Sequence, residues 1–256
     1  MQIVVHNLTV STTGKTLTSI GSGVALKEAT GYVVTNCHVT EEKTTIYIHP
    51  YSRDNAGDIR EKPFSQTPKG NVVYVEPELD LALVAVSGQL DTNGLELSAS
   101  ADMGQRVVAF GSPDYLHNTI FDGVVFSVDR KYKTISRGNW ESFTHFMDPN
   151  TTNITHTCAI YAGFSGGPVL DMSGRVVGIN WGGIIDYHET FAITSTDVKV
   201  QTLSPRIRNL LQKMPQMSDF ALNVTEGVVV MSVVFSPNDE HSSPPMAKKP
   251  KLSAEF

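Results

Sequence analysis

Residues 163–168 read Gly-Phe-Ser-Gly-Gly-Pro, which sets a serine in a glycine-rich turn. A serine that attacks a carbonyl carbon needs donors for the charge that develops on the carbonyl oxygen, and backbone N–H groups in such a turn can supply them. The alternative interpretation is an ordinary hairpin turn, because glycine turns are common. The stretch alone therefore favours Ser165 as a nucleophile without establishing it.

Two stretches upstream of this serine complete the pattern of a catalytic triad. Residues 31–39 read GYVVTNCHV, so an apolar strand ends in polar residues and presents His38 at its rim, where a general base belongs. Residues 78–84 read ELDLALV, so Asp80 begins an apolar strand, where a carboxylate needs a partner such as an imidazole N–H. Glu78 is a rival acid, but its neighbours indicate greater exposure. The order histidine, aspartate, serine is that of chymotrypsin-type enzymes.

Short runs rich in β-branched residues dominate the chain up to about residue 200. Strands are predicted at residues 2–5, 23–26, 32–35, 44–48, 71–75 and 81–86, and again at 107–111, 123–128, 159–161, 168–170, 176–180 and 190–193. Many short strands indicate barrels or a sandwich, and periodicity does not distinguish the two. Leucines and an isoleucine on one helical face predict a helix that ends near residue 214. Residues 227–235 form a further β-rich run, and 236–256, rich in Pro, Ser and charge, are expected to be disordered.

Taken together, these stretches resemble the HtrA/Deg-type trypsin-like serine peptidases. The resemblance covers roughly residues 1–200 and includes, in matching order, GSG at 21–23, GQRVVAFGSP at 104–113, RVVGIN at 175–180 and FAI at 191–193. It implies an all-β, chymotrypsin-like fold of two six-stranded antiparallel β-barrels with a C-terminal helix. It also implies an active site between the barrels and peptide hydrolysis without ATP, metal or other cofactor.

The resemblance further implies roles for particular residues. His38 would be the general base, Asp80 the acid that orients it and Ser165 the nucleophile, and the N–H groups of Gly163 and Ser165 would form the oxyanion hole. The residues expected near the pocket for the side chain before the scissile bond are Ala159, Ile160, Trp181 and Gly182. Because Ala159 and Ile160 carry no charge, we expect cleavage after small or medium apolar residues.

The expected organisation is an N-terminal barrel at 1–94, a C-terminal barrel with its helix at 95–214, an extra strand segment at 215–235 and a tail at 236–256. The family usually carries a PDZ domain after the peptidase; the residues that follow 214 are too few for one, so none is expected in this chain. Phe164 stands where the family often has a small polar residue, which changes how the oxyanion loop is held. Phe164 also cannot form the ion pair by which digestive trypsins capture a newly cut N-terminus.

Charge and cysteine content indicate the setting in which the chain works. A net charge of −6 gives no pull toward nucleic acid or an anionic membrane, and no apolar run is long enough to span a bilayer. With only two cysteines, Cys37 and Cys158, and no recognisable signal peptide, an intracellular, cytoplasmic location is expected. The basic run Lys248–Lys251 leaves nuclear import open. The expected partner is a polypeptide substrate, and assembly into a homo-oligomer stays open.

Two other functions stay open at this stage. The first is a catalytically inactive, protease-fold binding protein; the presence of all three triad residue types disfavours it, and Phe164 is its best support. The second is an esterase that uses the same triad, an activity that would accompany proteolysis. His156 and His188 do not match the motif by which some viral peptidases recognise Gln or Glu. A disulfide between the cysteines is unsupported, and their spacing does not suggest zinc.

Overall fold

The computed structural model describes residues 7–10, 16–19, 21–29, 31–40, 45–50, 68–87, 94–113, 119–135, 147–184, 189–195, 197–198 and 229–234. The strand expected at residues 2–5, the helix expected before residue 214 and the tail at 236–256 lie outside this described part of the chain.

The strands come in two groups along the chain. The first group is β1 (Asn7–Val10), β2 (Thr16–Ser19), β3 (Val24–Ala25), β4 (Tyr32–Thr35), β5 (Thr45–Pro50), β6 (Lys69–Glu76) and β7 (Leu81–Val86). The second group is β8 (Arg106–Gly111), β9 (Thr119–Lys131), β10 (Thr152–His156), β11 (Pro168–Asp171), β12 (Val176–Ile184) and β13 (Glu189–Thr194), and β14 (Val229–Val234) follows. Short helical turns separate some of them: η1 (Lys27–Ala29), α1 (Cys37–Thr40), η4 (Pro77–Leu79) and α2 (Tyr132–Ile135).

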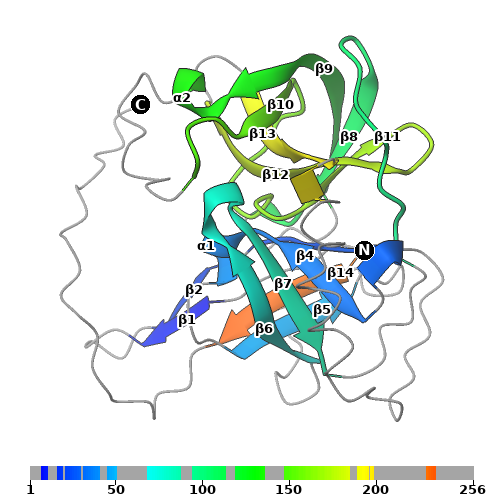
Figure 1. The fold of residues 1–256 in the computed structure, drawn as a ribbon. Coiled ribbons are helices and arrows are strands. Elements are labelled where there is room, and N and C mark those ends of the chain that lie inside the picture. The colour runs from blue at the N-terminus through cyan, green and yellow to red at the C-terminus, as the bar shows by residue number, and fades with distance from the viewer. Residues whose placement is uncertain are drawn as a thin grey trace.

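The two groups form two stacked β structures (Figure 1). The second group closes into a six-stranded barrel in the order β10-β13-β12-β11-β8-β9, which we call the C-terminal barrel. The first contributes to a curled six-stranded sheet in the order β14-β5-β6-β7-β4-β3, which we call the N-terminal sheet, while β1 and β2 pair separately. The all-β, chymotrypsin-like double-barrel architecture expected from the sequence is confirmed, with one half closed and the other a curled sheet.

One strand of the N-terminal sheet comes from the far end of the chain. β14 pairs antiparallel with β5, from Val229 opposite Pro50 to Val234 opposite Thr45, and Figure 1 shows it lying beside β5. The β-rich run noted at 227–235 is therefore built into the first half of the fold. Strand pairing uses backbone groups that every residue except proline carries, so the sequence did not reveal this partner.

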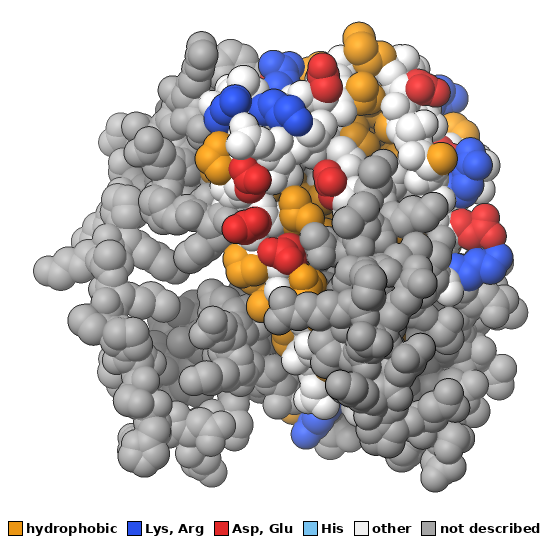
Figure 2. Space-filling view, in the orientation of Figure 1, with side chains coloured by type: hydrophobic (Ala, Val, Ile, Leu, Met, Phe, Trp, Pro, Cys, Tyr) orange, Lys and Arg blue, Asp and Glu red, His pale blue; other side chains and the backbone are white. Residues whose placement is uncertain are grey.

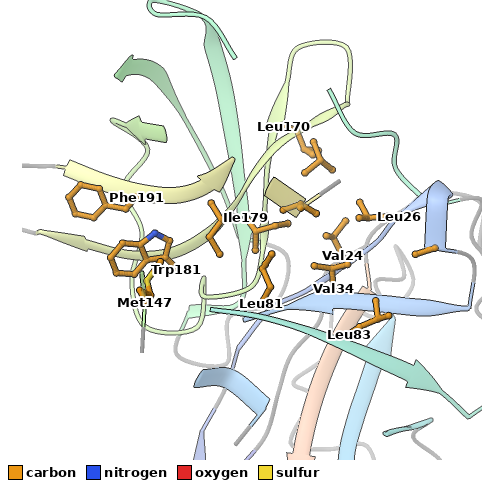
Figure 3. Packing of buried hydrophobic residues seen from close by; sticks show 14 of the residues in the cluster. Val24, Leu26, Val34, Leu81, Leu83, Met147, Leu170, Ile179, Trp181 and Phe191 are labelled. Atoms are coloured by element: carbon orange, nitrogen blue, oxygen red, sulfur yellow. The ribbon is translucent and has the colours of Figure 1, made fainter. Parts of the chain in front are cut away.

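Three apolar clusters follow from the alternation of side chains along the central strands. In β7, Leu81 and Leu83 face one cluster while Val84 and Val86 face another, because successive side chains point to opposite faces. The cluster containing Val84 fills the N-terminal sheet, and a separate cluster fills the C-terminal barrel. The cluster containing Leu81 joins the two halves, and Figure 3 shows Leu81 facing Ile179 of β12 within it. This shared cluster fixes how the two halves meet.

One predicted strand is wrong. Residues 159–161 do not form a strand, and the strand of this region is β10, at Thr152–His156. The Tyr161 carbonyl accepts the Phe164 N–H at 3.0 Å, so a tight turn begins there instead of a ladder. The polar composition of β10 concealed it, because Asn153 and His156 are fully buried although their side chains are polar.

Charge on the described surface is mixed in sign. Acidic and basic side chains are interspersed on the face shown in Figure 2, as expected for a chain with 20 basic and 26 acidic residues. Within the described ranges, no helix has the length and apolar character needed to cross a bilayer. Cys37 and Cys158 are not joined by a disulfide.

Candidate active site

Asp80 occupies an unusual backbone position at the start of β7. It ends the short turn η4, where its N–H donates to the Pro77 carbonyl at 3.0 Å, and its φ of 51° lies in the left-handed region. Aspartate tolerates this region better than most residues because its short polar side chain can bond locally. The kink between η4 and β7 sets Asp80 at the rim of the N-terminal sheet.

The structure pairs His38 with Asp80. The Nδ1 atom of His38 lies 2.6 Å from Oδ2 of Asp80, and the His38 backbone N–H donates to Oδ1 at 2.9 Å. The Asp80 side chain is 8% exposed, whereas the His38 side chain is 44% exposed. A carboxylate acceptor places the imidazole proton on Nδ1, so Nε2 is the nitrogen able to accept a proton.

Two further hydrogen bonds hold Asp80 against the segment that carries His38. The Asp80 carbonyl accepts from Nδ2 of Asn36 at 3.0 Å and from the Cys37 N–H at 3.1 Å. Glu78, the rival acid, is exposed. Of the two acids in this stretch, Asp80 is the one that the fold brings to His38.

The serine loop is built from two consecutive tight turns. The Phe164 N–H donates to the Tyr161 carbonyl at 3.0 Å, and the Gly167 N–H donates to the Phe164 carbonyl at 2.9 Å. The third residues of these turns, Gly163 and Gly166, have φ values of 106° and 83°, the sign that a type II turn requires there. Glycine is also needed at 163 for space, since a Cβ there would lie 2.3 Å from the Ser112 carbonyl oxygen.

The two predicted oxyanion donors lie on either side of Phe164. Among the hydrogen bonds of the described residues, none uses the N–H of Gly163 or of Ser165 as its donor. Their carbonyl groups, by contrast, both accept hydrogen bonds from Ser22. A turn whose carbonyls are held while its N–H groups stay available has the arrangement that stabilising an oxyanion needs.

Ser22, a fully buried residue of the N-terminal half, holds this loop in place. Its hydroxyl donates to the Gly163 carbonyl at 2.6 Å and accepts the Ser112 N–H at 3.2 Å. Its backbone N–H donates to the Ser165 carbonyl at 2.7 Å. The GSG stretch at 21–23 gives no sign of this role for Ser22, because contacts across the two halves leave no local signal.

The serine loop lies against the strand end that leads to His38. A Cβ on Gly166 would lie 2.1 Å from Oγ1 of Thr35 and 3.1 Å from the backbone N of Asn36. The residue after the serine therefore packs directly on the segment that precedes the histidine. A hydrogen bond between Ser165 and His38 stays a prediction.

Two buried polar residues of the C-terminal barrel support the serine loop. Asn180 in β12 accepts the Gly166 N–H at 2.8 Å and donates its own N–H to the Gly167 carbonyl at 2.9 Å. Its Oδ1 lies 3.0 Å from Nε2 of His156, a fully buried histidine in β10. Burial lowers the pKa of His156 to about 4, so this ring is neutral at pH 7 and serves as a structural hydrogen-bond partner. The sequence indicated no role for His156.

The four predicted pocket residues lie in two adjacent segments. Ala159 is exposed and Ile160 half-buried, and a Cβ on Gly183, next to Gly182, would lie 3.6 Å from Cγ1 of Ile160. The Trp181 side chain, however, is only 7% exposed and belongs to the cluster between the two halves. It stacks on Phe191 at a centroid distance of 5.6 Å, and its Nε1 donates to Oδ1 of Asn153 at 2.8 Å.

The site contains the side chains of nucleophilic hydrolysis. In the described part of the chain, no group of three or more His, Cys, Asp or Glu residues is placed to hold a metal ion. The second cysteine, Cys158, is buried, and desolvation raises the pKa of its thiol to about 11. The geometry brings the imidazole of His38 to the carboxylate of Asp80 and packs the serine loop on the segment that precedes His38.

Known proteins with similar sequences include serine proteases named HTRA2 and DegP. The chain is 30% identical over 197 residues to "Serine protease HTRA2, mitochondrial" of Bos taurus, a match that covers 76% of this chain and 36% of the relative. It is 29% identical over 164 residues to "Periplasmic serine endoprotease DegP" of Salmonella typhimurium, covering 63% of this chain and 30% of the relative. The chain thus spans about a third of the length of these curated relatives.

Solved structures show the same fold. "HtrA-type protease AlgW with decapeptide" superposes with a TM-score of 0.57 at 23% identity, over 78% of this chain and 54% of that chain. "Rv3671c protease from M. tuberculosis, active form" superposes with a TM-score of 0.56 at 24% identity, over 72% of this chain and 73% of that chain. The family described as "Trypsin-like peptidase domain" matches residues 21–179, the span that holds His38, Asp80 and Ser165. The sequence is similar to those of HTRA2 and DegP over part of their length, and this chain belongs to the trypsin-like peptidase family.

Proposed function

We propose that this chain is a serine endopeptidase in which His38, Asp80 and Ser165 form the triad. The observation that carries the proposal is the 2.6 Å contact between Nδ1 of His38 and Oδ2 of Asp80. A carboxylate that is 8% exposed lies against an imidazole that is 44% exposed. That arrangement orients the imidazole from its Nδ1 side at the rim of the fold, as a general base requires.

The proposed reaction begins when Oγ of Ser165 attacks the scissile carbonyl carbon and gives its proton to Nε2 of His38. The Asp80 carboxylate stabilises the imidazolium that forms. The N–H groups of Gly163 and Ser165 donate to the negatively charged oxygen of the tetrahedral intermediate. The imidazolium then protonates the leaving amine, an acyl-enzyme ester remains on Ser165, and water activated by the same imidazole hydrolyses it.

We further propose that the substrate is a polypeptide cleaved after a small or medium apolar residue. Ala159 and Ile160 support this preference, because a charged substrate residue beside them would lose hydration without gaining a partner. The names of the relatives, serine protease and endoprotease, support peptide rather than ester bonds as the natural target.

The test is labelling with a fluorophosphonate probe, which reacts with activated serines, alongside cleavage of a peptide library. Wild type should be labelled and should cleave peptides, whereas Ser165→Ala should do neither and should keep the same circular dichroism spectrum. Loss of a triad nucleophile lowers the rate by about 10⁶-fold in a well-studied enzyme. Ser100→Ala is the matched control because Ser100 is exposed in the connection between the two strand groups. Equal labelling of wild type and Ser165→Ala would disprove the assignment.

A further inference from the structure

The first turn of the serine loop, which contains Gly163, has an aromatic residue at each end, and both contact one ring. Phe121 of β9 lies 5.9 Å from Tyr161 and 5.7 Å from Phe164, measured between ring centroids, with interplanar angles of 59° and 33°. Tyr161 and Phe164 are the first and last residues of the turn closed by the 3.0 Å hydrogen bond from the Phe164 N–H to the Tyr161 carbonyl. The Phe121 side chain, which comes from β9, therefore contacts both ends of this turn.

The Phe164 ring fits a closely matched apolar site. Phe164 is fully buried and belongs to the cluster that fills the C-terminal barrel. A Cβ on Gly111, at the end of β8, would lie 2.4 Å from Cγ and Cδ1 of the ring, so the ring lies directly on the glycine backbone. A contact this close leaves the ring little freedom to move while the barrel stays folded.

Movement of Phe164 would displace both oxyanion donors. Gly163 and Ser165 are the neighbours of Phe164 in the chain, and the N–H and C=O of Phe164 each close one of the two turns. The position of the Phe164 ring is therefore linked to the direction in which the N–H groups of Gly163 and Ser165 point. Displacement of a donor away from the position of the oxyanion removes a large contribution to transition-state stabilisation.

We propose that Phe121 is a positioning residue, and that the row Tyr161–Phe121–Phe164 clamps the serine loop at Phe164 so that the N–H groups of Gly163 and Ser165 are held ready for an oxyanion. This inference rests on the serine endopeptidase function proposed above. Here the loop is anchored by apolar burial, with no charged residue at position 164. The aromatic pairs add directional contacts beyond the buried area.

The decisive variant is Phe121→Leu, which removes the shared ring but keeps an apolar side chain. We expect kcat to fall roughly tenfold, a fraction of the roughly 10²–10³-fold cost of losing a whole oxyanion donor, while KM changes less than about twofold. Affinity for a peptide boronic acid, whose tetrahedral adduct places a hydroxyl in the oxyanion hole, should fall together with kcat. Ile120→Ala is the matched control, since Ile120 neighbours Phe121 in β9 and is 52% exposed.

Tyr161→Leu gives a second measurement that is independent of core folding, because Tyr161 is 53% exposed. It should also lower kcat with KM retained, and the double variant with Phe121→Leu should lose less than the product of the two single losses, because both remove the same contact. If both variants keep wild-type kcat and boronate affinity, the clamp is disproved. If wild type fails to react with the fluorophosphonate probe, the proposed function itself fails, which is a different result.

Discussion

The hydroxyl of Ser22 donates a 2.6 Å hydrogen bond to the carbonyl of Gly163, although the two residues are 141 positions apart in the chain. This contact joins the N-terminal half to the loop of the C-terminal half that carries the proposed nucleophile. The same residue donates its backbone N–H to the Ser165 carbonyl at 2.7 Å. Through one serine, the N-terminal half holds the carbonyl groups on both sides of Phe164.

Ser22→Ala should therefore lower kcat more than a control variant with the same loss of unfolding free energy does. The variant leaves the Gly163 carbonyl without its strongest partner, and we expect kcat to fall about tenfold with little change in KM, a part of the cost of losing an oxyanion donor. Ser98→Ala is the control, because Ser98 is also buried and donates its hydroxyl to a backbone carbonyl, that of Ser100. Both variants should lose about 1 kcal/mol of unfolding free energy, measured in urea. Equal kcat for the two variants would contradict a positioning role for Ser22.

Asp80→Asn should reduce kcat by about 10⁴-fold while the protein stays folded, as the same change does in a chymotrypsin-fold enzyme. The amide can still accept the His38 backbone N–H through its oxygen, but its NH₂ would meet Nδ1 and favour the wrong tautomer. Glu78→Gln is the matched control, because Glu78 is the rival acid and is exposed. The measurement is steady-state cleavage of one peptide by both variants. A larger loss for Glu78→Gln than for Asp80→Asn would reverse the assignment of the acid.

The free energy of unfolding should decrease as the pH falls, and the titration of His156 should cause part of this decrease. Its pKa is lowered to about 4 in the folded state by burial, so between that value and the ordinary value near 6.5 the unfolded chain binds a proton that the folded chain does not. The contribution of His156 to the free energy of unfolding has its full value above about pH 7. It decreases as the pH falls and is about 2 kcal/mol smaller at pH 5. His156→Gln lacks this titration, so its unfolding free energy should change less between pH 7.5 and pH 5. Identical pH dependence in both proteins would show that His156 titrates normally.

Specificity should follow from Ile160, which is half-buried beside Gly183. A substrate-library profile should favour Val, Ala, Leu or Thr before the scissile bond. Ile160→Phe should lower kcat/KM for Leu substrates about tenfold relative to Ala substrates, the range expected for changes of a few methylene groups in an apolar pocket. A profile dominated by Arg or Lys, or an unchanged Leu-to-Ala ratio in the variant, would place the pocket elsewhere.

The sequence predicted the secondary structure well where short runs of apolar residues were continuous. The runs at 32–35 and 81–86 match β4 and β7, because β-branched and apolar side chains buried on both faces give an unambiguous strand pattern. It failed at Thr152–His156, where buried polar residues imitate a loop, and at 159–161, where apolar residues belong to an irregular segment. In both places tertiary contacts overrode local propensity.

By itself, the sequence determined the chemical types and the order of the reactive residues, because a histidine, an aspartate and a serine each stand beside a strand or turn with a recognisable local signature. Only the tertiary structure decided which acid meets His38, since Asp80 and Glu78 are two residues apart and the left-handed turn at Asp80 sets the carboxylate against the histidine. It also decided that Ser22 and Phe121 contact the turn that contains Gly163. Those contacts join residues far apart in the chain, and they depend on how two β structures pack, which no local pattern of residues records.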